Sequence, residues 1–122
     1  MFSKIAIVTI PVRDQTAAKS FYTNVLGCKV LEEMLMTPGS NWIRLEFPGV
    51  ETRLVLANWF KQMPPGSLQG IVLITDNIAQ TCQELKSRGL AVSEIKDMPY
   101  GKEATFDDPD GNGWVLQQPA AR

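Results

Sequence analysis

The sequence contains no histidine, and only two of its 122 residues are cysteines. Without histidine, neither a Ser-His-Asp nor a Cys-His centre can form, and no metal can be held through an imidazole. Cys28 and Cys82 form no CxxC pair and show no metal-ligand spacing. We therefore expect two reduced thiols in a cytoplasmic protein.

The chain also lacks an excess of basic residues, since 12 Lys and Arg face 13 Asp and Glu, for a net charge of −1. Nucleic-acid binding depends on neutralising phosphates, so we expect no nucleic-acid partner. No apolar run approaches the roughly 20 residues that a helix needs to cross a bilayer. The first residues, Met1 to Lys4, do not resemble a signal peptide. These features predict no association with a membrane.

One pattern of alternating apolar strands and amphipathic helices occurs twice. Asp14 and Asp76 are predicted N-caps, and Gly27 and Gly89 follow the ends of the two predicted helices. A stretch containing Pro64-Pro65-Gly66 interrupts the pattern and is interpreted as a linker. The first half predicts a helix at 14–26 and strands at 4–12, 28–35, 41–47 and 52–57. The second predicts a helix from 76 to 88 and strands at 68–75, 90–95, 102–106 and 113–118.

The two halves align at a fixed offset of 62 residues without a gap. This offset places Asp14 on Asp76 and Gly27 on Gly89. It also pairs several apolar positions: Ile10 with Val72, Val12 with Ile74, Ala17 with Ala79, and Leu54 with Leu116. Agreement of caps, glycines and apolar positions at one shift indicates an internal repeat.

The predicted fold class is α+β, with two tandem βαβββ modules that form curved mixed sheets around a cavity. A small sheet with a helix on one face leaves the other face uncovered, so two such sheets can enclose a ligand site. We interpret residues 1–122 as a single domain. Its parts are module one at about 1–57, a linker at about 58–67 and module two at about 68–118.

The residues that open and close this pattern resemble the vicinal oxygen chelate superfamily. The opening match is Val12-Arg13-Asp14, then Phe21-Tyr22 and Leu26-Gly27, and the closing match is Phe106-Asp107-Asp108-Pro109-Asp110-Gly111-Asn112. The superfamily includes glyoxalase I, fosfomycin-resistance enzymes, extradiol dioxygenases, and proteins that bind bleomycin and mitomycin. The resemblance implies paired βαβββ modules, commonly assembled as homodimers.

The resemblance also locates the positions where enzyme members of the superfamily hold a metal. In this sequence those positions carry Ile7, Arg53, Gln69 and Val115. Only Gln69 offers a suitable donor, and Arg53 would repel a cation. We therefore expect no metal and no cofactor, which disfavours the metal-dependent reactions of the family.

The same four residues, Ile7, Arg53, Gln69 and Val115, are predicted to line a ligand site. Arg53 either forms a bidentate hydrogen bond with an anionic ligand or pairs with an acid such as Glu46 or Glu103. Gln69 either hydrogen-bonds a ligand or is a satisfied polar residue between the modules.

Aromatic residues form a second set of candidates for ligand binding: Trp42, Tyr100 and Trp114. Trp42 is in phase with Arg44 and Glu46, which favours the concave face, although core or dimer packing is the alternative for the aromatic residues. Trp59 and Phe60, in the linker, are interpreted as dimer contacts.

Three residues are candidate acid–base groups: Glu46, Glu103 and Tyr100. A glutamate in a closed cavity can act as a base, but nothing in the sequence selects a reaction.

The leading hypothesis is a metal-free homodimer that binds a small molecule between its modules. The first alternative is a glyoxalase-like lyase or isomerase with altered, non-metal chemistry. The second alternative is a non-catalytic interaction protein.

Overall fold

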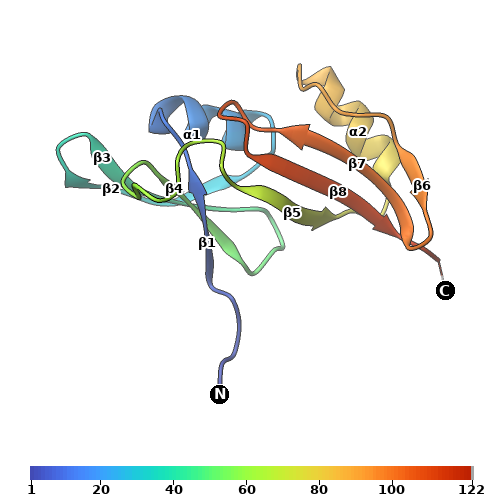
Figure 1. The fold of residues 1–122 in the computed structure, drawn as a ribbon, viewed down its shortest axis with the longest axis horizontal. Helices are drawn as coiled ribbons and strands as arrows, with labels where there is room; N and C mark the ends of the chain where they lie inside the picture. Colours follow the sequence, from blue (N-terminus) through green and yellow to red (C-terminus); the bar gives the residue numbers. More distant parts are fainter. Residues whose placement is uncertain (122) are drawn as a thin grey trace.

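The structure is a computed structural model that describes residues 1–121. Its elements follow the order strand, helix and three strands, and this order occurs twice (Figure 1). The first set is β1 (Ile7–Pro11), α1 (Gln15–Asn24), β2 (Lys29–Thr37), β3 (Ser40–Glu46) and β4 (Arg53–Ala57). The second is β5 (Gln69–Ile74), α2 (Ile78–Ser87), β6 (Lys96–Met98), β7 (Gly101–Asp107) and β8 (Gly113–Pro119). The two βαβββ modules predicted from the sequence are therefore present.

Each module forms one four-stranded mixed sheet. The strand order is β1-β4-β3-β2 in the first sheet and β5-β8-β7-β6 in the second. In both, the first and last strands of the module pair in parallel, and the other pairs are antiparallel. Among the described residues no strand of one sheet pairs with the other, so the sheets do not close around a common space (Figure 1).

Both helices begin at a side-chain cap. The Asp14 carboxylate accepts a hydrogen bond from the Ala17 N–H, and the Asn77 side chain accepts one from the Gln80 N–H. The prediction that Asp76 caps the second helix is therefore wrong by one residue. Neither described helix is long and apolar enough to cross a membrane.

The one-residue difference originates in β5, at Gly70. Between Gln69 and Ile71, β5 advances two residues while β8 advances one, and Gly70 adopts a φ of +84°. This bulge reverses the faces predicted for the rest of the strand. Val72, the predicted mate of buried Ile10, is exposed. The offset between the modules is thus 63 from Gly70 to the cap (77 − 14), and it returns to 62 at Gly89 (89 − 27).

The strand predicted at 90–95 is also absent from the structure. Only β6, three residues long, pairs with β7 in this part of the chain. Ser93 explains the difference, because its hydroxyl, rather than its carbonyl, accepts the Thr105 N–H, while its own N–H donates to the Thr105 carbonyl. A side chain thus replaces one strand–strand bond at this position.

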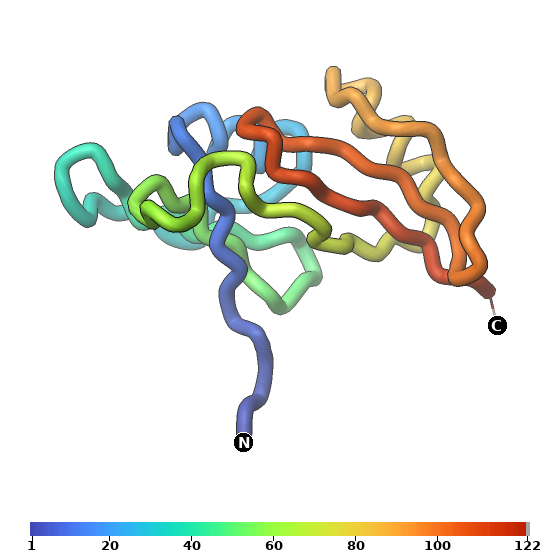
Figure 2. Tube along the Cα trace, viewed as in Figure 1, coloured from blue at the N-terminus to red at the C-terminus, as the bar shows by residue number. Residues whose placement is uncertain are grey.

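A buried polar network joins the two modules. Figure 2 shows the turn between β7 and β8 beside α1. Tyr22 of α1 donates a 2.8 Å hydrogen bond to the Asp108 carboxylate, and the Trp114 indole N–H donates to the Tyr22 hydroxyl at 3.1 Å. Asn112 donates to the Pro11 carbonyl at 2.8 Å. The opening and closing motifs of the sequence therefore meet in space and hold the modules together.

Candidate functional site

Each sheet has one face covered by its own helix and an opposite face, which we call the open face. In the first sheet, Ile10 and Leu54 are buried in the core beneath α1. Strand alternation places Ile7, three residues before Ile10, and Arg53, next to Leu54, on the open face. In the second sheet, Leu116 is buried in the core, so its neighbour Val115 lies on the open face, with Val72 across the pair.

The four predicted ligand positions divide between the two sheets. Ile7 and Arg53 are register partners in β1 and β4. Gln69 pairs with Gly113, whereas Val115 pairs with Val72, because the bulge shifts β5 along β8. The structure thus brings together the first two residues, and places the other two on one sheet but not opposite each other.

Arg53 is engaged by its own module. Its guanidinium lies 3.3 Å from the Glu46 carboxylate and donates to the carbonyls of Val50 and Glu51. This is the arrangement that the sequence offered as the alternative to anion binding. A cation already paired and hydrogen-bonded gives a weak attraction for an anionic ligand.

The side-chain amide of Gln69 is also engaged in hydrogen bonds within the chain. Its amide N–H₂ donates to the carbonyls of Gly66 and Gly111 at 3.1 and 2.9 Å. Its Oε1 lies 2.1 Å from the place that a Cβ of residue 113 would take, so a side chain at that position would displace the Gln69 amide. Gln69 therefore ties the linker, the β7–β8 turn and β8 to one another.

A divalent metal of the kind used by the superfamily does not fit these residues. Ile7 and Val115 offer no donor atom, Arg53 is a cation, and the amide of Gln69 is used internally. Among residues 1–121 no group of three or more His, Cys, Asp or Glu side chains is placed to hold a metal ion.

The first open face instead carries an aromatic pair beside an ion pair. The rings of Trp42 and Trp59 are stacked, with centroids 6.4 Å apart and planes 29° apart. The Trp42 indole N–H donates to Glu32 at 3.3 Å, and Arg44 Nε lies 2.8 Å from the same carboxylate. That Arg44 contact is an ion pair without an aligned hydrogen bond. The linker residue Trp59, predicted as a dimer contact, thus packs on its own module.

The second open face carries two of the candidate acid–base groups. The hydroxyl of Tyr100 donates to the Glu103 carboxylate, and this hydrogen bond raises the pKa of Tyr100 above its ordinary value. Tyr100 is 49% exposed. The third candidate, Glu46, is paired with Arg53. Both candidate carboxylates, Glu46 and Glu103, are thus engaged by a neighbouring side chain.

Trp114, predicted to contact a ligand, lies in the interior. It is 1% exposed and stands on the opposite face of β8 from Val115. Its ring stacks on Phe106 at 6.2 Å and meets Phe47 edge-on at 6.1 Å. Trp114 therefore packs the junction between the modules, because alternation along β8 turns it toward the core.

The two cysteines are buried and free. Burial raises the pKa of the Cys28 thiol to about 12, and it also raises the pKa of Cys82. Raised values disfavour the thiolate, so neither residue has the environment of a reactive nucleophile.

Sequence reasoning did not identify two of the residues that shape the first open face and its support. The carboxylate of Glu32 accepts the Trp42 hydrogen bond and forms the ion pair with Arg44. Glu32 follows an irregularity in β2 that no pattern in the sequence marks. Gln15 is buried and bonds Asn41 and the Leu56 carbonyl, tying the start of α1 to β3 and β4. A glutamine in a first helical turn is an ordinary surface residue in a sequence.

Two βαβββ modules, each with a helix on one sheet face and an open opposite face, define a paired-module protein of the glyoxalase type. Residues 4–116 match the Glyoxalase/Bleomycin resistance protein/Dioxygenase superfamily. The chain belongs to this family.

Similar proteins include both solved structures and curated sequences. One is TnmS3, an antibiotic binding protein from Streptomyces sp. CB03234, with 41% identity, 98% of each chain covered and a TM-score of 0.91. A second is a glyoxalase/bleomycin resistance protein from the same organism, with 42% identity and a TM-score of 0.83 over 94% of this chain and 100% of that one. The uncharacterized protein YetH of Bacillus subtilis is 33% identical over 97% of this chain and 100% of its own length.

Proposed function

We propose that this protein binds a small molecule at the open faces of its sheets without a metal cofactor. The observation that carries the proposal is the Trp42–Trp59 stack on a face whose metal positions hold no suitable donor set. Similarity to an antibiotic binding protein over almost the whole chain supports a binding function. The engagement of Arg53, Glu46, Glu103 and Tyr100 in internal contacts favours binding over acid–base catalysis.

The ligand we propose is uncharged and planar. On the first open face, the charges of Arg44 and Arg53 are balanced by Glu32 and Glu46 within ion-pair distance. A balanced face neither attracts an ion strongly nor repels a neutral molecule. Trp42 and Trp59 are half-buried, and the indole surface that they leave in solvent gains free energy by stacking against a flat ring.

We also propose that two copies assemble and that the assembled open faces complete the site. Within one chain the sheets do not close, and β1 and β5 are edge strands. Apolar side chains on these edges are solvent-exposed, with Ile7 at 36% and Val72 at 47%. Unpaired edges with apolar side chains are surfaces that proteins ordinarily cover. A cytoplasmic location, which suits the two free thiols, is part of the same proposal.

The test is equilibrium binding of uncharged polycyclic aromatic antibiotics to tag-free protein treated with EDTA, followed by calorimetry. Saturable binding is expected, and Trp42→Ala should weaken it about fivefold to tenfold, as loss of one stacking surface costs about 1–1.5 kcal/mol. Phe2→Ala is the control, because Phe2 is 93% exposed and outside both sheets. Equal affinities of the Trp42→Ala protein and the unsubstituted protein would reject the site.

A further inference from the structure

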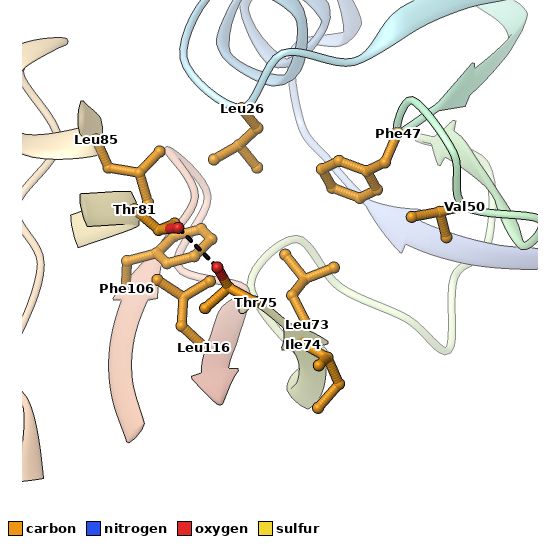
Figure 3. Close-up of a pocket in the computed structure, with 10 residues that line it drawn as sticks. All are labelled: Leu26, Phe47, Val50, Leu73, Ile74, Thr75, Thr81, Leu85, Phe106 and Leu116. Atoms are coloured by element: carbon orange, nitrogen blue, oxygen red, sulfur yellow. Dashed lines mark hydrogen bonds between the residues drawn. The ribbon is translucent and has the colours of Figure 1, made fainter. Parts of the chain in front are cut away.

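The structure contains an apolar cleft between the two modules that the proposed ligand site does not use. Its volume is about 230 Å³. Figure 3 shows side chains of the first module facing those of the second across it. The side chains that carry the argument are Leu26, Phe47 and Val50 from module one, and Leu73, Leu85 and Phe106 from module two.

The cleft lies on the helix side of the second sheet and not on its open face. Leu73 and Phe106 pack with the core beneath α2, and Leu85 belongs to α2 itself. The open face of the same strands carries Val72 and Val115 instead. Of the residues that line the cleft, Ile74, at the end of β5, is on the same side of the strand as Val72, so the cleft adjoins the open face there but is otherwise on the helix side.

The lining of the cleft determines which molecules suit it. None of the described residues that line it is charged. Its polar side chains are Thr75 and Thr81, whose hydroxyl oxygens lie 2.8 Å apart and bond to each other. A well-held water needs two to four polar partners, and this pair offers few free sites. An apolar molecule would thus displace solvent from the cleft without breaking a strong set of hydrogen bonds.

Size and access narrow the class of ligand further. An apolar protein cavity of about 150 Å³ is enough to bind benzene, and this cleft is larger. Val50, at its edge, is 43% exposed, so the cleft can be reached from solvent. We propose that it is a second binding site, for a neutral aromatic molecule of one or two fused rings with one hydrogen-bonding group. That group bonds to the hydroxyl pair of Thr75 and Thr81.

The experiment uses two probes, 6-fluoroindole and 1-fluoronaphthalene, observed by ¹⁹F NMR with the full-length protein. Both should show saturable binding. Val50→Phe, which fills the cleft from its exposed edge, should weaken both probes at least tenfold. Val30→Phe is the matched control, since Val30 is 40% exposed on β2 and does not line the cleft. It should leave both affinities unchanged.

A second variant tests the role of the hydroxyl pair. Thr81→Val keeps the shape but removes one hydroxyl, so 6-fluoroindole should bind about fivefold more weakly, from the loss of one hydrogen bond. The affinity of 1-fluoronaphthalene should not change.

Absence of saturable binding, or equal effects of Val50→Phe and Val30→Phe, would overturn the proposal. A third outcome would also overturn it: the unsubstituted protein binds neither probe, and Val50→Phe changes the sedimentation coefficient. The cleft would then be a contact between subunits. Trp42→Ala should leave the part of the probe binding that Val50→Phe weakens unchanged, which separates this site from the open face.

Discussion

The Tyr22 hydroxyl donates a hydrogen bond to the Asp108 carboxylate across the junction of the two modules, over a distance of 2.8 Å. The carboxylate also accepts from the Asn112 side chain and from the backbone N–H groups of Asp110 and Asn112. Tyr22 is fully buried and Asp108 is 5% exposed. A buried carboxylate is stable only with such a set of donors. The shape of the closing turn is thus explained by module packing rather than by ligand contact.

Tyr22→Phe should lower the free energy of unfolding by about 2 kcal/mol, because it leaves a buried carboxylate with one donor fewer. Tyr100→Phe is the matched control, since it removes the bond to Glu103 at an exposed site. Water competes for both partners of an exposed bond, so its loss should change stability little. Urea denaturation measures both losses. Similar losses for the two variants would contradict the role assigned to the buried pair.

The free energy of unfolding should fall at alkaline pH, and ionisation of the buried thiols in the unfolded state should be the first cause. The pKa of Cys28 rises from 9.0 to about 12 on folding, so the unfolded state loses its proton first. Below pH 9 this thiol therefore costs the folded state nothing. Between pH 9 and 12 it lowers the free energy of unfolding by about 1.4 kcal/mol per pH unit. Burial also raises the pKa of Tyr22 above its ordinary value of 10, which adds to the decline above pH 10.

Cys28→Ala isolates the contribution of that thiol. Between pH 9 and 10 the unfolding free energy of this variant should decline less steeply than that of the unsubstituted protein, measured by denaturation at each pH. Parallel curves for the two proteins would show that the Cys28 thiol does not titrate differently in the folded and unfolded states.

Gly66→Ala should be more destabilising than Gly49→Ala. Both glycines have a similar positive φ, +85° and +79°, which costs an alanine about 1–2 kcal/mol. A Cβ at position 66 would lie 2.3 Å from the Asp110 carbonyl oxygen, whereas at position 49 it meets nothing within 4 Å. The difference between the two melting temperatures therefore reports the contact of the linker with the β7–β8 turn. Equal melting temperatures would exclude a tight contact there.

Most of the fold could be predicted from the sequence, because alternation and helix caps are local signals. One exception was the strand predicted at 90–95, and the other was β5, where one extra residue at Gly70 reversed the faces of Val72 and Ile74. Both residues are apolar in either register, so no hydrophobic pattern reveals the slip. The cap shift from Asp76 to Asn77 follows from the same residue, since both side chains can cap a helix.

The candidate site was less predictable for a different reason. The sequence correctly offered Glu46 as a partner of Arg53, because the alternation of β3 placed it in reach. Trp114 was assigned to the ligand although it packs the core, since an aromatic residue on a strand suits either face. The Trp42–Trp59 stack joins a strand to a linker whose path depends on tertiary contacts, and no local pattern encodes that path.

Val72→Lys should weaken self-association if the open edges of the sheets meet in a homodimer. A lysine on the apolar surface beside β5 would place a charge in the interface, at a cost of several kcal/mol unless it reaches solvent. Sedimentation velocity at micromolar concentration should show a dimer for the unsubstituted protein and a shift toward monomer for the variant. Lys29→Ala, on β2 at the opposite edge of the first sheet, serves as the control and should leave the dimer unchanged. A monomeric unsubstituted protein would contradict the proposed assembly.

The most direct test of the account is the metal content of tag-free protein after incubation with Mn, Fe, Co, Ni and Zn salts and removal of unbound ions. Inductively coupled plasma mass spectrometry measures the ions that remain. The account predicts far less than one ion per chain, because Ile7, Arg53, Gln69 and Val115 supply no donor set. One tightly held transition-metal ion per chain, lost in Gln69→Ala, would contradict it.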